Sequence, residues 1–286
     1  MSIPLKISII SPSFNSEKTI EKTILSVVSQ QKNCHLEYII IDGGSTDRTC
    51  EIINKYINSI NLFISEADAG AYDAINKGIS LATGDIIGII NSDDWYQNDA
   101  IKIVEQIFSN YLDIDVLYSP IDNYFEGEYV ATFSPGDLDK LPIRFTLNHP
   151  SCFIKKSAYD LVGLYDLQYK IAADYDLILR LFISGFKFHY IDTPLAAYSL
   201  NGMSSAANFL ERAKLIKECW RISKQTTRYQ GENLDYQRNQ AYLRWVLNEV
   251  FAIPARYFLK PPTARKVKTF INKYIKKPVS DDYGKW

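Results

Sequence analysis

Four short apolar stretches in the first third of the chain each run directly into a loop rich in acidic, hydroxyl and glycine residues. The stretches are residues 6–10, 37–41, 62–64 and 85–90, and the loops are residues 11–15, 42–47, 65–70 and 91–95. Helical periodicity fills the intervals, which predicts β-α-β units and a parallel sheet. Because ligands bind at the carboxyl ends of the strands in such a sheet, we expect the four loops to form one site.

The rest of the chain continues this alternation and then departs from it. Helical spacing predicts helices over residues 17–30, 47–56, 71–81 and 99–108 and a fifth strand at 116–118. A hairpin turning at Gly127 follows, then a strand at 147–154, helices at 157–162 and 174–184, and a strand at 188–191. Beyond residue 204 the pattern is helical. We expect one α/β domain over residues 1–204 and a helical extension over residues 205–286.

Composition narrows the class of protein. The formal net charge of −1 over 286 residues gives no reason to expect nucleic-acid binding. The four cysteines are dispersed without a Cys-x-x-Cys pair, which indicates neither a zinc site nor a redox motif and is typical of a reducing cytosol. The first residues lack a signal-peptide pattern, and no apolar run approaches the roughly 20 residues that span a bilayer. The expected location is the cytoplasm.

Two of the four loops carry residue types suited to a phosphorylated ligand. Carboxylates combined with substrate phosphates hold Mg²⁺ and similar ions, so Asp93 and Asp94 are candidates for a cation on a diphosphate. In residues 42–47, two glycines let the backbone approach a ligand, and Asp42 can accept a hydrogen bond from a nucleotide base. The loop matches neither the dinucleotide fingerprint nor the P-loop. Acidic residues also cap helices, and the residue types alone leave that alternative open for Asp47 and for the Asp pair.

With two later stretches, these motifs resemble the family 2 glycosyltransferases of the GT-A fold, inverting enzymes of the type that builds bacterial polysaccharides. The shared stretches, in the order typical of that family, are residues 10–15, 23–30, 40–47, 68–78, 82–85, 91–94, 149–151 and 173–176. They span about residues 5–200. The resemblance implies a mostly parallel nucleotide-binding sheet flanked by helices, a small mixed sheet on the acceptor side, and a helical C-terminal extension.

The resemblance also implies roles for the matching positions. The nucleotide-sugar would be held by Pro12, Ser13, Asn15, Asp42, Asp68, Asn76, Lys77 and Asp93. Asp94, together with Asp93, would bind Mn²⁺ or Mg²⁺. Asp174 would be the general base that takes the proton from the acceptor hydroxyl.

Three further positions have two interpretations each, and a fourth bears on the identity of the donor. Asp176 is a second candidate for the base, although either acid could instead cap the helix that follows. His149 could reach the metal or the diphosphate, or it could be a packed residue. Trp95 could lie under the acceptor or in the core. Asp73 stands where many relatives carry an arginine that faces the nucleotide, so a UDP-sugar is favoured but not fixed.

The expected function is the transfer of a sugar from a nucleotide-diphosphate sugar to a glycan or polyprenyl-linked acceptor. A sugar-phosphate nucleotidyltransferase would need a glycine-rich N-terminal loop with a basic residue, and residues 11–15 have neither. A non-catalytic nucleotide-sugar-binding module is disfavoured by the Asp pair together with Asp174. A dehydrogenase lacks its dinucleotide fingerprint.

The end of the chain is strongly basic. Residues 251–286 contain nine Lys or Arg and two Asp. A helix predicted from Thr263 to Lys277 places Val267, Phe270, Ile271 and Tyr274 on one face and lysines on the other. Such a helix can lie on the inner face of an anionic membrane as a peripheral contact, or it can pack on its own domain.

Overall fold

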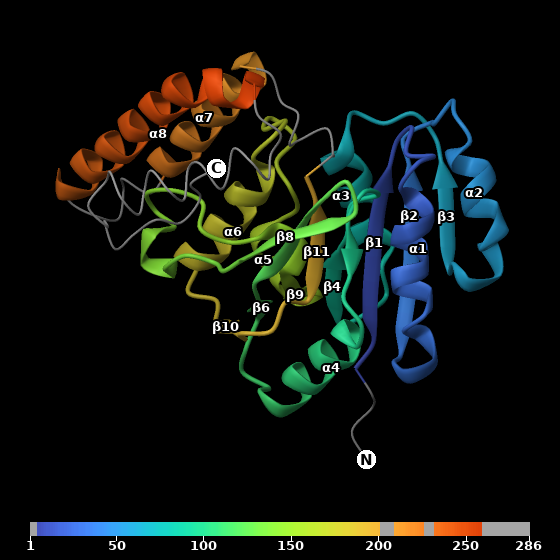
Figure 1. Cartoon of the computed structure of the whole chain (residues 1–286). Helices are drawn as coiled ribbons and strands as arrows, with labels where there is room; N and C mark the ends of the chain where they lie inside the picture. The colour runs from blue at the N-terminus through green and yellow to red at the C-terminus, as the bar shows by residue number, and fades with distance from the viewer. Residues whose placement is uncertain (1–4, 201–208, 226–231, 259–286) are drawn as a thin grey trace.

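The computed structural model describes residues 5–200, 209–225 and 232–258 (Figure 1). In this part of the chain, seven strands form the main sheet in the order β10-β6-β9-β4-β1-β2-β3. They are β1 (Ile7–Ser13), β2 (Leu36–Asp42), β3 (Leu62–Ser65), β4 (Ile86–Ile89), β6 (Val116–Tyr118), β9 (Phe153–Lys155) and β10 (Phe188–Tyr190). Neighbouring strands are parallel except β9, which runs antiparallel to both β4 and β6.

Helices cover both faces of this sheet, because its strands alternate the direction of their apolar side chains. In β2, Tyr38 and Ile40 pack against one face while Ile39 and Ile41 pack against the other. The first face carries α1 (Ile20–Val28), α2 (Thr49–Lys55) and α4 (Ala100–Asn110). The opposite face carries α3 (Ala71–Leu81), α5 (Lys156–Val162) and α6 (Ala173–Ile183). Such a sheet is buried on both sides, as parallel sheets are.

A second, mixed sheet has four strands in the order β5-β11-β7-β8. They are β5 (Trp95–Tyr96), β7 (Ile121–Phe125), β8 (Glu128–Phe133) and β11 (Ala196–Ser199). The expected hairpin is β7 and β8, and it turns at Glu126 and Gly127, whose φ angles of 51° and 84° are both left-handed. A turn with two left-handed residues matches the twist of the flanking strands, which explains a glycine here.

Two long helices complete the described chain. α7 (Phe209–Ser223) and α8 (Glu232–Phe258) lie side by side, and α7 packs against α6 (Figure 1). Their residues Cys219, Ile222 and Tyr242 join the hydrophobic cluster of α3, α5 and α6. The expected boundary at residue 204 and the predicted helix from Thr263 to Lys277 lie outside the described residues, so both stay predictions. No helix in the described ranges is both long and apolar enough to cross a membrane.

The predicted fold class is confirmed, with one local correction. The strand expected at 147–154 is wrong over most of its length, because residues His149–Ser151 form a 3₁₀ turn and only Phe153–Lys155 is a strand. Pro150 has no N–H to give to a sheet ladder. The Ser151 hydroxyl instead donates to the backbone oxygens of Asn148 and Ser119, at 2.9 and 2.7 Å.

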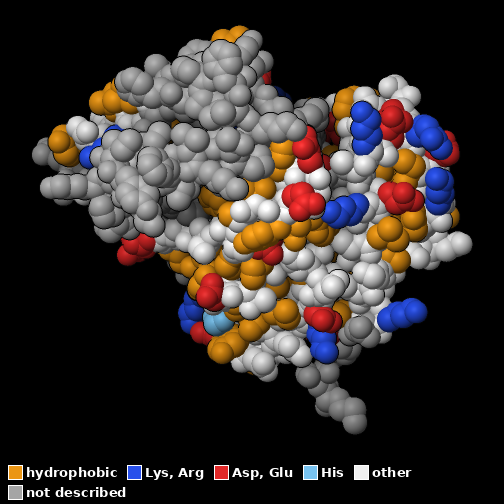
Figure 2. All heavy atoms as spheres, in the orientation of Figure 1, with side chains coloured by type: hydrophobic (Ala, Val, Ile, Leu, Met, Phe, Trp, Pro, Cys, Tyr) orange, Lys and Arg blue, Asp and Glu red, His pale blue; other side chains and the backbone are white. Residues whose placement is uncertain are grey.

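The surface over α1, α2 and β3 carries charges of both signs. Figure 2 shows basic and acidic side chains interspersed over these elements.

One buried carboxylate joins the strands at the edge of the sheet away from the four loops. Glu37 of β2 accepts hydrogen bonds from Lys6 Nζ (2.9 Å), Ser8 Oγ (2.5 Å) and both the N–H and hydroxyl of Thr83 (2.8 and 2.6 Å). Burial by itself would raise the pKa of Glu37, but these hydrogen bonds outweigh it and lower the pKa to about 2. The residue therefore ties together β1, β2 and the turn before β4.

We expect Glu37→Gln to destabilise the protein by about 1 to 2 kcal/mol at neutral pH, a discounted part of what the pKa shift allows. A carboxylate whose pKa is lower in the folded state stabilises it above the unfolded pKa. The difference from wild type should therefore vanish as pH falls from about 4.5 toward about 2. Urea unfolding at a series of pH values measures it. The exposed Glu51→Gln variant is the control, and an equal loss at every pH would contradict the assignment.

Candidate active site

The four acidic and hydroxyl-bearing loops lie at one edge of the sheet. β1, β2, β3 and β4 are parallel, and Ser13, Asp42 and Ser65 are aligned across the ends of β1, β2 and β3. The loop after β4 joins this edge through a 2.7 Å hydrogen bond between the hydroxyls of Ser16 and Ser92. Because β9 is antiparallel, the His149–Ser151 turn that leads into it meets β4 at the same edge.

Asp42 is the centre of a buried hydrogen-bond cluster at this edge. Its carboxylate accepts from the hydroxyls of Ser13 (2.9 Å), Ser45 (2.5 Å) and Ser65 (2.7 Å) and from the backbone N–H of Gly44 and Ser45. Burial alone would raise its pKa, but these donors, led by Ser45, lower it. Asp42 is fully buried and joins the ends of β1, β2 and β3, and its predicted contact with a nucleotide base stays a prediction.

The first loop is shorter than expected, because β1 continues through Ser13. Pro12 and Ser13 are therefore buried strand residues. Asn15 follows on the surface with a left-handed φ of 46°. Its N–H donates to Ser45 Oγ (2.8 Å), and its side-chain oxygen accepts from the N–H of Thr46 (2.9 Å). Asn15 thus connects the first loop to the second.

Asp68 reaches over the second loop, and a glycine makes room for it. A Cβ at position 43 would lie 2.8 Å from Asp68 Oδ2, closer than real Cβ atoms come to such an atom. The other Asp68 oxygen accepts from the N–H of Gly70 at 2.8 Å. Gly43 therefore permits a half-buried carboxylate at a place where any larger residue would displace it.

The other two predicted binding residues, on α3, are already engaged with protein groups. The Asn76 amide makes two hydrogen bonds with the backbone of Tyr165, one donated at 2.8 Å and one accepted at 2.9 Å. Lys77 forms an ion pair with Glu66 at 2.5 Å. The Asn76 side chain thus holds the backbone of the segment that carries Tyr165. The position of Asn76 in a shared motif did not predict this structural role.

The two members of the Asp pair have different environments. Asp94 is fully buried, and its oxygens accept from the N–H of Ser199 (3.0 Å) and the amide of Asn91 (3.2 Å). Asp93 is only partly buried and, among the described residues, its carboxylate receives a hydrogen bond only from its own backbone N–H. Burial raises the pKa of both, and for Asp94 the Asp93 charge adds to the effect. Asp93 is therefore the better placed of the two to meet a cation.

The second pair, on α6, divides in the same way. Asp176 is 3% exposed and forms a 2.8 Å ion pair with Arg180, whose guanidinium also donates to the carbonyls of Val162 and Leu164. Asp174 is partly exposed, and its Oδ1 accepts from the N–H of Tyr175 (2.8 Å) and the hydroxyl of Tyr72 (3.3 Å). The hydrogen bonds from Tyr175 and Tyr72 both go to Oδ1. Burial raises the pKa of Asp174, opposed by nearby His149.

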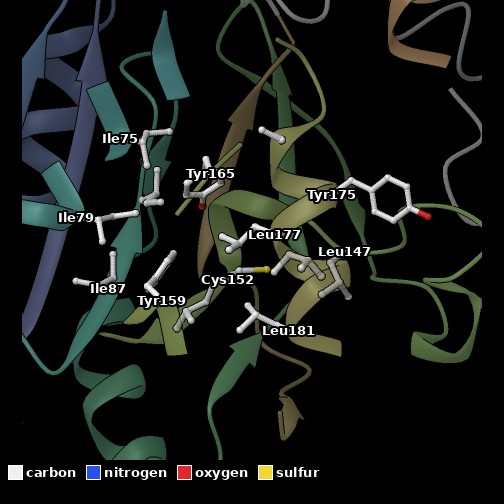
Figure 3. Close-up of a cluster of buried hydrophobic side chains, with 14 of the residues drawn as sticks. Ile75, Ile79, Ile87, Leu147, Cys152, Tyr159, Tyr165, Tyr175, Leu177 and Leu181 are labelled. Atoms are coloured by element: carbon white, nitrogen blue, oxygen red, sulfur yellow. The ribbon is translucent and has the colours of Figure 1, made fainter. Parts of the chain in front are cut away.

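His149 lies beside Asp174 in a tyrosine-rich part of the core. Its Nε2 is 2.7 Å from the hydroxyl of Tyr165, and burial lowers the pKa of His149, which favours the neutral ring. Tyr165 also stacks on Tyr72 with ring centroids 5.5 Å apart. Figure 3 shows Tyr165 between Ile75 of α3 and Leu177 of α6. Neither Tyr72 nor Tyr165 was predicted as a site residue from the sequence. Tyr72 could have been noticed because it lies in a shared stretch, whereas nothing in the sequence marks Tyr165.

Trp95 begins the second sheet directly after the Asp pair, and it lies in an aromatic cluster. Its ring is 4.8 Å from that of Tyr124, and Lys22 Nζ lies 2.9 Å from the Trp95 ring centroid. Burial lowers the pKa of Lys22. Trp95 is partly exposed, and its two predicted positions, under the acceptor or in the core, both stay predictions. Lys22 and Tyr124 have no sequence signal, because only the fold brings α1 to β7.

Among the described residues, no three His, Cys, Asp or Glu side chains gather closely enough to hold a metal by themselves. The donor set still fits a divalent cation shared with a substrate. Mg²⁺ is commonly held by one or two carboxylates plus phosphates, and it retains several waters. Asp93, which is partly exposed beside the buried Asp94, offers such a carboxylate.

Comparison with known proteins agrees with this geometry. Residues 8–158 match the sequence profile of Glycosyl transferase family 2. A PGL/p-HBAD biosynthesis glycosyltransferase of Mycobacterium bovis is 28% identical over 221 residues, covering 74% of this chain and 85% of that protein.

Solved structures show the same fold at lower identity. TarS 1-349 of S. aureus in complex with UDP has a TM-score of 0.65 and 18% identity, covering 94% of this chain and 78% of that one. The mannosyltransferase PcManGT from Pyrobaculum calidifontis, in complex with GDP-Man and Mn²⁺, has a TM-score of 0.65 and 14% identity, covering 96% and 82%. The expected GT-A fold is therefore confirmed. Because the profile matches more than half of its length, this chain belongs to glycosyl transferase family 2.

Proposed function

We propose that this glycosyltransferase moves a sugar from a nucleotide-diphosphate sugar to a hydroxyl of a glycan or polyprenyl-linked acceptor, with inversion at the anomeric carbon, in surface polysaccharide biosynthesis. The observation that carries the proposal is the state of Asp174. Asp176 is buried and paired with Arg180, whereas Asp174 is partly exposed, receives hydrogen bonds from Tyr72 and Tyr175 on Oδ1, and has a raised pKa.

Asp174 acts as the general base in this proposal. The acceptor hydroxyl loses its proton to Asp174 Oδ2 as its oxygen attacks the anomeric carbon, and the bond from that carbon to the diphosphate breaks. A raised pKa makes the ionised carboxylate a stronger base, and Tyr72 holds the other oxygen in place. A single displacement of this kind inverts the configuration at the anomeric carbon.

In this proposal Asp93 holds the cation and the ribose side of the donor. Asp94 supports the loop through its hydrogen bonds with Asn91 and Ser199. This reverses the order predicted from the sequence, where Asp94 was the main ligand. Mn²⁺ or Mg²⁺, when bound, neutralises charge on the departing diphosphate. Asp68 and the backbone around Gly43 line the base. The similar structures contain UDP in one case and GDP-Man with Mn²⁺ in another, so a UDP-sugar remains a preference.

Trp95 and Tyr124 offer a face for an acceptor sugar, beside the positive charge of Lys22. Aromatic rings in such an arrangement present large apolar surfaces with little conformational freedom to lose. A polyprenyl-linked acceptor would bring the enzyme to the inner face of a membrane, where the basic segment from Thr263 to Lys277 would make a peripheral contact.

Replacing Asp174 with asparagine should lower kcat about 10²- to 10⁴-fold, the usual contribution of a general base. Donor affinity should hardly change, because the lost group acts on the acceptor proton. Steady-state transfer assays and calorimetric titration with the donor measure the two quantities. Asp176→Asn is the matched comparison, and it should mainly lower thermal stability, since Asp176 pairs with Arg180. An inactive but stable Asp176→Asn protein beside an active Asp174→Asn protein would reverse the assignment.

The pH profile should show a base with a raised pKa. Since only the ionised carboxylate accepts the proton, kcat/KM should fall on acidification at a higher pH than the ordinary aspartate pKa of about 3.9 would give. The hydrogen bond from Tyr72 lowers the pKa of Asp174, so Tyr72→Phe should move this acid limb to still higher pH. Rates measured across acidic to neutral pH test both statements. An unmoved or lowered limb in Tyr72→Phe would show that Asp174 is not the group that titrates.

The two acids of the β4 loop should separate in a metal titration. Asp93→Ala should raise the Mn²⁺ concentration for half-maximal activity about tenfold or more, a loss of at least about 1.4 kcal/mol. Asp94→Asn should instead lower the melting temperature, because the new amide would face the N–H of Ser199. Full activity of the wild type in excess chelator would remove the metal from the proposal, and the opposite behaviour of the two variants would restore Asp94 as the ligand.

A further inference from the structure

A carboxylate from α7 holds the segment that leads into α6. The Oε1 of Glu218 accepts from the N–H of Lys170 at 3.0 Å, and its Oε2 accepts from the N–H of Ile171 at 2.9 Å and of Ala172 at 3.0 Å. Three consecutive backbone N–H groups therefore converge on one side chain that lies about 46 residues further along the chain. Such a run of N–H groups is a binding site for negative charge, and here the protein supplies the anion itself.

The start of α6 needs this partner because its own sequence provides no cap. The residue at the N-cap position is Ala172, which has no side-chain acceptor. A helix begins with N–H groups that lack partners and with a partial positive charge, so an acid placed there is stabilising. Asp174 already uses one oxygen on the N–H of Tyr175. Without Glu218, the N–H groups just before α6 would compete for the Asp174 carboxylate or for water.

Tyr72 of α3 contacts both this segment and Asp174, the proposed base. The hydroxyl of Tyr72 is 2.9 Å from the carbonyl oxygen of Ile171 and 3.3 Å from Asp174 Oδ1. Ile171 thus has its N–H bound to Glu218 and its carbonyl bound to Tyr72. A shift of this residue would move both Tyr72 and the first turn of α6.

Other residues of α7 contact the same segment. Arg221 donates to the side chain of Gln168 at 2.5 Å, and its guanidinium lies 5.5 Å from the ring centroid of Tyr169. Gln225, two residues beyond the end of α7, donates to the Tyr169 hydroxyl at 2.6 Å. Positions 218 and 221 lie on one face of α7. This face, together with Gln225, contacts residues 168–172, and Glu218 binds the residues of this segment that directly precede α6.

We infer that Glu218 is a positioning residue for the base, which makes α7 a part of the catalytic apparatus even though it lies beyond the residues that match the family profile. The inference rests on the proposed role of Asp174. Loss of Glu218 would let the first turn of α6 shift, and a misplacement of about 1 Å can cost about 10²-fold in rate. The backbone N–H groups that Glu218 binds belong to residues 170–172, and the four loops proposed to hold the nucleotide-sugar follow β1 to β4, so donor binding would be spared.

The test uses Glu218→Gln and Glu218→Ala in the full chain, with Glu211→Gln as the control on the same helix. Glu211 forms its ion pair with Lys214, within α7 itself. Glutamine keeps the size of the side chain, but its amide N–H₂ would oppose one of the three backbone N–H groups. We expect kcat to fall about 10- to 100-fold in Glu218→Gln, with the donor KM and donor affinity within about twofold of wild type. The acid limb of the pH profile should also move, because the environment of Asp174 changes.

The outcomes separate the inference from the function on which it rests. Assays run well below the melting temperature of each variant exclude unfolding as the cause, and Glu218→Gln decides if Glu218→Ala does not fold. A lower melting temperature with unchanged kcat and pH profile in Glu218→Gln would leave Glu218 a purely structural residue and overturn the inference. An inactive Asp174→Asn protein beside a fully active Glu218→Gln protein would also overturn the inference about Glu218. A fully active Asp174→Asn would instead overturn the proposed function.

Discussion

The structure depends on supplying hydrogen-bond donors to carboxylates that the fold buries. A buried charge without partners is very costly, so each such acid must gather donors from several segments. Glu37 gathers them from Lys6, Ser8 and Thr83 at one edge of the sheet, and Asp42 gathers them from three serines at the other. Because these donors come from different strands, satisfying the acids also sets the positions of the strand ends and of the loops that follow.

The same requirement divides the acids at the site into two kinds. Asp94 and Asp176 are buried and committed to Ser199 and Arg180, whereas their neighbours Asp93 and Asp174 remain partly exposed. The hydrogen bonds of Asp94 and the ion pair of Asp176 fix the backbone next to Asp93 and Asp174. This is the arrangement expected where charged groups must be held in one orientation for catalysis, since supporting hydrogen bonds fix the geometry of the groups that act.

The two halves of the site come from different parts of the fold. The first four strands bring the four loops proposed to bind the donor to one edge, while Asp174, the proposed base, lies on α6, a helix preceded by three N–H groups bound to an acid from α7. Capping from another helix lets the position of the base depend on the C-terminal helices. Those helices also share the hydrophobic cluster of α3, α5 and α6, so the described part of the chain packs them against the catalytic region.

The sequence by itself determined the order and kind of the elements and the region of the site. Apolar periodicity predicted β1 to β4, α3 and the β7–β8 hairpin, because local pattern and burial on a two-sided sheet agree there. It misplaced the strand before Phe153, where Pro150 ends the ladder. The residue types alone did not rank the acids within each pair, and the predicted ranking came from the family resemblance. Two adjacent aspartates have the same chemistry, and only the tertiary structure decides which one meets an N–H or an arginine. Tertiary structure alone also brought Tyr165, Lys22 and Glu218 to their partners, because contacts across tens of residues leave no local pattern in the sequence.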